Sequence, residues 1–302
     1  MGYADAEYAV SLQEFGEPVR LVRCQGSVLI RPTPHRPYAD AIGPYPIFSC
    51  ADWTLLAEDI DALDPDLVSL TIVADPLGEW SVDLLRECFP DWMIPFKEHF
   101  VVELTDAVLP TPNAHHRRNA RKALQTLKVD VVQRPTEVLE EWTALYANLV
   151  TRHGIRGISA FSPDAFARQA RLPDLVAIRA RENDTTVGCT LWLQQNGGAY
   201  YHLGAYSDRG YELGASFALF SVAIEHFSSE GLSWLSLGAG PGATTSGAEG
   251  ADGLTRFKAG WSTRTCTAYL CGRIMNHRRY WELAGNSTET DYFPVYRRGE
   301  VA

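Results

Sequence analysis

Lysine is scarce in this sequence of 302 residues, so most of its 27 basic residues are arginines. The lysines stand at Lys97, Lys122, Lys128 and Lys258 only. No apolar stretch approaches the ~18 residues that a membrane-crossing helix needs. Residues 1–7 are acidic, whereas a signal peptide begins with basic residues. These absences predict a soluble, cytoplasmic protein with no membrane partner.

Cysteine motifs are missing as well. The six cysteines form no Cys-x-x-Cys pair, and no histidine lies near them at zinc-finger spacing. We therefore expect reduced, buried thiols, no metal and no bound cofactor. The hydrophobic share of 46% and the charged share of 21% are those of an ordinary globular protein. A chain of this length buries enough surface to fold without a disulfide or a metal.

The net charge of -10 is unevenly distributed along the chain. Residues 1–110 hold 19 acidic and 6 basic residues, for a net charge of -13, and residues 111–302 carry +3. The acidic balance argues against non-specific nucleic-acid binding by the whole protein but allows a basic face on the second part. The change falls at a proline-rich joint at 109–113, which predicts two domains, 1–110 and 111–302.

The hydrophobic pattern predicts an α/β fold with mixed sheets. Strands and helices alternate in the first part, with strands expected at 19–23, 27–31, 67–73 and 98–104 and helices at 51–63 and 81–88. In the second part we expect helices at 113–127, 136–151 and 213–229, and strands at 129–132, 175–180, 187–193, 199–206 and 232–237. The tail adds a helix at 253–259, a strand at 261–271 and a helix at 275–284.

A glycine-rich stretch carries the most informative motif. A strand end at Gly238 and Gly240 is followed by a loop of small residues and then by the motif residues Gly253, Leu254, Phe257, Lys258, Gly260 and Trp261. Together with the element order, this motif resembles the Fem-type aminoacyltransferases of the GNAT acyltransferase superfamily. The resemblance covers about 111–284 and extends weakly into 17–106. It implies tandem GNAT-like domains, of which the N-terminal one is degenerate.

The resemblance assigns roles to several residues. It implies that Lys258 stabilises the oxyanion of a tetrahedral intermediate and that Phe257 packs the acyl group. Gly238, Gly240, Arg256 and Trp261 are then expected to line the substrate site. Tyr201, Tyr206 and Asp208, on and just past the strand at 199–206, are further candidates for substrate binding. A surface role is the alternative for Lys258, because most lysines are exposed.

His202 on the same strand is a candidate general base for the attacking amine. Alternation along the strand predicts Tyr201 on one face and Tyr200 and His202 on the other. A structural histidine on a half-buried strand is the alternative.

Two features bear on the acyl donor. Acyl-CoA-using relatives carry a glycine where this chain has Glu212, between Arg209 and Gly214, and a carboxylate there would repel a pyrophosphate. Glu212 could also simply complement a helix dipole. The helix at 113–127 is basic and contains no acid, and Arg117, Arg118, Arg121 and Lys122 could bind tRNA phosphates or form an ordinary solvated face.

The sequence thus favours an aminoacyltransferase that moves an aminoacyl group from aminoacyl-tRNA, as co-substrate, to an amine of a small molecule or peptide. Such an amide could serve the assembly of a peptidoglycan precursor or of a natural product. The alternatives are an acyl-CoA-dependent N-acyltransferase and a catalytically inactive binding protein of the same fold.

Overall fold

The structure is a computed structural model that describes residues 1–34, 36–104, 112–240, 251–285 and 292–298. These residues form two compact units, each of which is discontinuous in sequence. Unit 1 comprises residues 1–2, 97–155 and 166–266, and unit 2 comprises residues 3–96, 156–165 and 267–302. The chain thus crosses between units inside a strand, after Phe96, whereas the predicted boundary at residue 110 and the loop of small residues at 241–250 lie outside the described residues.

Unit 1 is built on a mixed sheet with strand order β5-β10-β9-β8-β7-β6. Its strands are β5 (Trp92–Glu103), β6 (Lys128–Val132), β7 (Leu175–Glu182), β8 (Thr185–Gln195), β9 (Gly198–Tyr206) and β10 (Trp234–Ala239). Neighbouring strands are antiparallel except for β9 and β10, which run parallel. The two hairpins predicted between 175 and 206 are confirmed.

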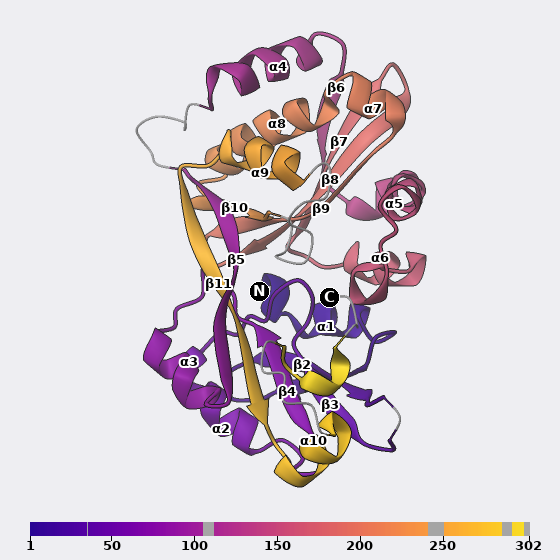
Figure 1. The fold of residues 1–302 in the computed structure, drawn as a ribbon. Helices are drawn as coiled ribbons and strands as arrows, with labels where there is room; N and C mark the ends of the chain where they lie inside the picture. The colour runs from indigo at the N-terminus through magenta and orange to yellow at the C-terminus, as the bar shows by residue number, and fades with distance from the viewer. Residues whose placement is uncertain (35, 105–111, 241–250, 286–291, 299–302) are drawn as a thin grey trace. The chain divides into compact units, whose positions relative to one another are not determined.

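The helices of unit 1 are α4 (Ala114–Leu124), α5 (Leu139–His153), α7 (Asp208–Glu212), α8 (Ala215–Ser229) and α9 (Ala251–Ala259), together with the end of α6 (Pro163–Gln169), which begins in unit 2. In Figure 1, α4, α8 and α9 lie together on one side of the sheet, and α5 and α6 lie on the other. Capping residues start three of them: Asn113 Oδ1 accepts from the His116 N–H at 2.9 Å, Ser162 Oγ from the Ala165 N–H at 3.1 Å and Ser207 Oγ from the Gly210 N–H at 3.1 Å.

The core of unit 1 lies between the sheet and α8. Helix α8 contributes Phe220 and Phe227, both fully buried, and the sheet contributes Trp192 and Leu235. Trp192 lies 5.7 Å from Phe220 and 5.5 Å from Phe227, measured between ring centroids. This packing fixes α8 on the sheet, and α4 and α9 pack against α8 in turn.

Unit 2 is a second α/β layer, with strand order β1-β2-β3-β4-β11. Its strands are β1 (Glu17–Leu21), β2 (Gly26–Pro32), β3 (Ala39–Ile42), β4 (Ser69–Val73) and β11 (Arg264–Ile274), which enters from unit 1. The helices are α1 (Ala6–Ser11), α2 (Leu56–Asp61), α3 (Val82–Cys88) and α10 (His277–Ala284). Helices α2 and α3 bury apolar residues in a shared core with the sheet.

The mixed α/β fold predicted from the sequence is confirmed. The elements differ in detail: the helix expected at 213–229 is α8, which begins at Ala215, and Gly214, with a φ of 67°, separates it from the short α7 that precedes it. The strand expected from Trp261 begins only at Arg264, because Trp261 turns back to donate its N–H to Lys258 O. Among the described residues, no helix is long and apolar enough to cross a membrane.

Candidate functional site

The candidate site lies in unit 1, where β9 and β10 part. The two strands pair from Trp234 to Ser236 of β10, and the last pair is Ser236 with Tyr200. Beyond it, the pairing of β10 becomes irregular: its register with β5 shifts between Ser236 and Ala239, and Gly238 adopts a φ of 75°, at which a side chain would be strained. The facing edges of β9 and β10 therefore have backbone polar groups beyond the last pair, a feature that can bind a substrate amide.

Lys258 reaches this point from α9. Its side chain is only 5% exposed, and Nζ donates a hydrogen bond to Ala239 O at 2.6 Å. Nζ also lies 5.7 Å from the centre of the Tyr201 ring, and a Cβ at position 238 would lie 3.3 Å from it. Burial, reinforced by the charge of Lys97, lowers the pKa of Lys258 to about 7. The ammonium group has three protons, so two remain for other acceptors.

Lys97 and His99 are functional candidates that the sequence reasoning missed. They stand two residues apart on β5 and so point to the same face of the sheet. His99 lies opposite Ala239 in the β5–β10 pairing, and its Nδ1 is 3.5 Å from Ser236 Oγ. Burial, followed by the charges of Lys258 and Lys97, lowers the pKa of His99 to about 3. Two of the four lysines thus face one buried region, and alternation along β5 was the signal that could have found it.

Phe257 occupies a place different from the one expected. The centroid of its ring lies 4.9 Å from that of Phe220 and 5.1 Å from that of Phe217, and both of these residues are on α8. Trp261 is 2% exposed and belongs to the same core. Consecutive helical residues point about 100° apart, so Phe257 supports α9 from one side while Lys258 points toward the end of β10. Phe257 and Trp261 therefore belong to the apolar core that supports the site.

His202 and Tyr201 lie on opposite faces of β9, as alternation predicted. Tyr201 packs 5.0 Å from Phe220 on the α8 side, while His202 Nε2 lies 3.2 Å from Gln169 Oε1 of α6. Burial lowers the pKa of His202 to about 3, so the ring is neutral and a weak proton acceptor. This environment favours the structural role for His202 over the general-base role.

The other predicted substrate residues are dispersed. Tyr206 shares a hydrogen bond between hydroxyl groups with Tyr201, and burial raises its pKa well above the usual value. Asp208, at the start of α7, is exposed and accepts from Arg152 Nη1 at 2.7 Å. Arg256 is exposed on α9. Gly240 lies near the same helix, since a Cβ at this position would be 3.0 Å from Thr255 Oγ1. Tyr201 and Gly238 lie beside Lys258, whereas Asp208 pairs with Arg152 of α5.

The stretch that binds pyrophosphate in acyl-CoA-using relatives is occupied by ion pairs. Arg209 donates to Glu182 Oε1 at 2.6 Å and to Glu212 Oε2 at 3.0 Å. The Gly210 N–H donates to Ser207 Oγ at 3.1 Å, as part of the first turn of α7. The bond to Arg209 lowers the pKa of Glu182, which keeps this carboxylate charged. A pyrophosphate would meet two carboxylates here, so these residues fit coenzyme A poorly.

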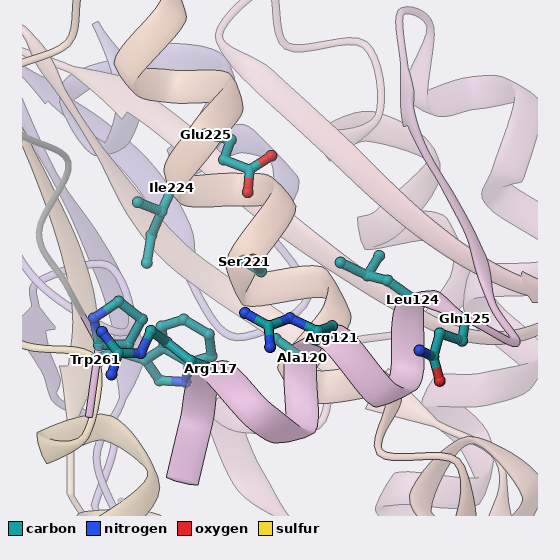
Figure 2. A pocket seen from close by; sticks show the side chains of 10 residues that line it. Arg117, Ala120, Arg121, Leu124, Gln125, Ser221, Ile224, Glu225 and Trp261 are labelled. Carbon is teal, nitrogen blue, oxygen red and sulfur yellow. The ribbon is translucent and has the colours of Figure 1, made fainter. Parts of the chain in front are cut away.

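A groove of about 630 Å³ runs between α4 and α8. Figure 2 shows Arg117 and Arg121 of α4 facing Ser221, Ile224 and Glu225 of α8 across it. The four cations predicted to bind tRNA, Arg117, Arg118, Arg121 and Lys122, are all exposed. Within the described part of the chain, none of the four forms an ion pair. The described residues also contain no cluster of three or more metal-binding side chains.

Comparison with known proteins identifies the class of fold. Residues 113–258 match the family model described as an acetyltransferase (GNAT) domain. This region extends from the N-cap of α4 to Lys258 and includes the parting of β9 and β10. Residues 113–258 are therefore similar to GNAT acetyltransferase domains. No curated protein matches the chain in sequence.

Solved structures share the fold over nearly the whole chain. A crystal structure of FemX has a TM-score of 0.67 at 15% identity and covers 92% of this chain and 93% of its own. The C-terminal domain of a putative lysylphosphatidylglycerol synthetase from Agrobacterium fabrum has a TM-score of 0.60 at 16% identity and covers 92% and 90%. L-PGS from Bacillus licheniformis has a TM-score of 0.59 at 14% identity and covers 91% and 94%. The predicted resemblance to Fem-type proteins is confirmed at the level of the fold.

Proposed function

We propose that the protein transfers an aminoacyl group from aminoacyl-tRNA to a primary amine of a small molecule or peptide. The observation that most directly supports this proposal is the position of Lys258, a buried ammonium group that donates a hydrogen bond to Ala239 O where β9 and β10 part. Its place in the motif that resembles Fem-type enzymes supports the same role.

In the proposed reaction, the neutral amine attacks the carbonyl carbon of the aminoacyl ester. A C–N bond forms, and the carbonyl oxygen becomes an oxyanion. Lys258 donates to this oxygen, and the developing negative charge favours the protonated form of the lysine when it is needed. Collapse of the intermediate breaks the ester C–O bond, and the proton lost by the amine goes to the departing ribose oxygen. One such donor stabilises the transition state by ~3–4 kcal/mol.

The choice of donor rests on charge. Arg209 is held by Glu182 and Glu212, and these carboxylates oppose a pyrophosphate. By contrast, α4 presents four exposed cations without an acid on the same helix, which suits the phosphates of an RNA. Acyl-CoA remains the second candidate because the matching family model is described as an acetyltransferase domain.

A transfer assay tests the proposal. The purified full chain is given either bulk tRNA charged with radiolabelled amino acids or radiolabelled acetyl-coenzyme A, each with a panel of peptides and small amines. Mild base removes label held as an ester, so the remaining label reports amide product. We expect amide only with charged tRNA. Amide only with acetyl-coenzyme A would establish the second candidate, and donor binding without transfer would establish an inactive binding protein.

A further inference from the structure

His116 is a buried histidine with no place in the reaction described above. It stands in the first turn of α4 and is 4% exposed, although its neighbours His115 and Arg117 are exposed. Its Nε2 lies 2.9 Å from Phe257 O, and its Nδ1 lies 2.9 Å from Asn113 Oδ1. Burial lowers the pKa of His116, so the ring is neutral and carries one N–H. Phe257 O and Asn113 Oδ1 both only accept. We assign the ring N–H to Nε2, because Asn113 Oδ1 already accepts the backbone N–H of His116.

The carbonyl that His116 binds belongs to the last turn of α9, where backbone acceptors lack partners in a following turn. The chain satisfies the neighbouring acceptors itself: Gly260 N donates to Arg256 O, and both Trp261 N and Ser262 N donate to Lys258 O. Phe257 O instead receives its bond from His116 of a different helix. This carbonyl is part of the peptide group that joins Phe257 to Lys258, so the bond fixes the backbone at the lysine itself.

Gly260 explains why the two helices approach so closely. A Cβ at this position would lie 2.2 Å from Cε1 and 2.5 Å from Nε2 of the His116 ring. The Asn113 N–H also donates to Gly260 O at 3.1 Å. Two hydrogen bonds and one close ring contact therefore hold the end of α9 against the start of α4, and the glycine of the Phe-Lys-x-Gly motif is required by the histidine.

We propose that His116 is a positioning residue that fixes the end of α9 so that Lys258 Nζ reaches Ala239 O. The structural part of this inference stands alone, and its consequence for catalysis rests on the proposed function. Rings on three sides, Phe217, Phe257 and Trp261, lie 5.1 to 5.4 Å from the His116 ring between centroids and hold it in place. A looser α9 would let Lys258 leave its buried position and regain water.

The pKa of Lys258 indicates whether its side chain occupies this buried position. Among the residues that the structure describes, the charged or titratable groups beside it are Lys97 and His99 from β5 and Tyr201 from β9, all on strands. Burial is the main reason that the Lys258 pKa lies near 7. Release into water would return the pKa toward 10.5, the ordinary value for lysine.

A matched pair of variants tests the hydrogen bond to Phe257 O separately from the other contacts of the His116 side chain. The amide nitrogen of glutamine reaches about as far as Nε2 of histidine, whereas that of asparagine reaches only as far as Nδ1. His116→Gln should therefore keep the bond to Phe257 O, and His116→Asn should lose it. The chain has four lysines, so 13Cε-lysine NMR can follow the Lys258 titration in each full-length variant.

We expect His116→Asn to raise the Lys258 midpoint by about one unit or more, with His116→Gln near the wild type. In the transfer assay, His116→Asn should lower kcat about tenfold with little change in KM. A folded His116→Asn protein with an unchanged Lys258 midpoint would overturn the inference. Wild-type protein without any transfer activity, but with the midpoint shift in His116→Asn, would refute the proposed function and leave the positioning role standing.

Gly260→Ala provides a second test if His116→Asn does not fold. The new methyl group would displace the His116 ring, and we expect the same upward shift of the Lys258 midpoint. Gly253→Ala, in the same helix, is the matched control, because a Cβ there meets nothing within 4 Å. Equal Lys258 midpoints in folded Gly260→Ala and Gly253→Ala proteins would overturn the inference.

Discussion

Lys258 is buried, and its surroundings disfavour the charged form of its side chain. Burial and the nearby Lys97 both favour its neutral form, while the hydrogen bond to Ala239 O favours the ammonium form. At neutral pH the two forms are thus close in free energy. A small change in the local charge, such as an oxyanion within hydrogen-bonding distance, is then enough to select the cation.

Replacing Lys258 tests its role most directly. We expect Lys258→Ala to reduce kcat by ~10²–10³ with a smaller change in donor KM, because the interaction strengthens in the transition state. Lys258→Arg should recover only part of the rate, since a planar guanidinium cannot reproduce a point charge. Steady-state kinetics in the transfer assay measure both effects. Lys128→Ala, at an exposed lysine, is the control, and a Lys258→Ala rate within about twofold of wild type would exclude the catalytic role.

The pH dependence of kcat distinguishes an ammonium donor from a neutral base. The Lys258 pKa is lowered to about 7, so the cation is lost as the pH rises through that value. At saturating donor and acceptor we expect kcat to fall above about pH 7. Lys258→Arg should lack this limb, because arginine stays protonated throughout the range. A kcat that instead rises through pH 7 in the wild type, with no such rise in Lys258→Arg, would assign Lys258 as a base.

At the scale of elements, α4 presents different groups to the core and to solvent. His116, Ala120 and Ala123 are buried, and the residues between them supply exposed cations. The same helix therefore contacts α9 through His116 and lines a groove with α8 through Arg117 and Arg121. Helix α4 would then connect a polyanion bound to its cations with α9, the helix that carries Lys258.

Neutralising α4 tests its interaction with RNA. A variant with Arg117, Arg118, Arg121 and Lys122 changed to glutamine should bind charged tRNA more weakly. The slope of log affinity against log salt should flatten by roughly one unit for each phosphate that the variant no longer binds. Binding titrations at several salt concentrations measure this. Arg134→Gln, at an exposed arginine paired with Glu137, is the control. An unchanged affinity in the fourfold variant would make α4 an ordinary solvated face.

At the scale of the whole molecule, unit 2 depends on a buried ion pair between distant parts of the chain. Asp40 on β3 is 1% exposed, and Arg297 near the C-terminal end donates to its Oδ1 at 3.0 Å. Arg297 also donates to Pro32 O at 2.7 Å, and the Tyr296 hydroxyl donates to Asp40 Oδ2 at 2.9 Å. The C-terminal segment is thus held to β2 and β3 by polar groups away from water.

Removing this arginine should destabilise the protein strongly. Arg297→Met leaves a buried carboxylate with less compensation, and we expect the free energy of unfolding to fall by about 3 kcal/mol or more. Arg278→Met, at an exposed arginine of α10, should change it by less than about 0.5 kcal/mol. Urea denaturation measures both. Equal stabilities for the two variants would contradict the structural importance of the buried pair.

The sequence by itself determined the elements and the motif. Apolar periodicity located α5, α8 and the hairpin strands, and the structure shows that Asn113 and Ser162 cap α4 and α6. These signals are local, because a cap or a helical stripe depends on residues within a turn or two. The scarcity of lysine and the position of Lys258 in its motif also singled out the residue that the structure buries.

Only the tertiary structure decided which residues meet. His116 and Phe257 are 141 positions apart, and the convergence of Lys97 and His99 on the Lys258 region depends on the register between β5 and β10. The same packing placed Phe257 and Trp261 in the core and brought Gln169 of α6 to His202. Local patterns carry no information on register or on the separation of two strands, because those follow from how the whole sheet and its helices pack together.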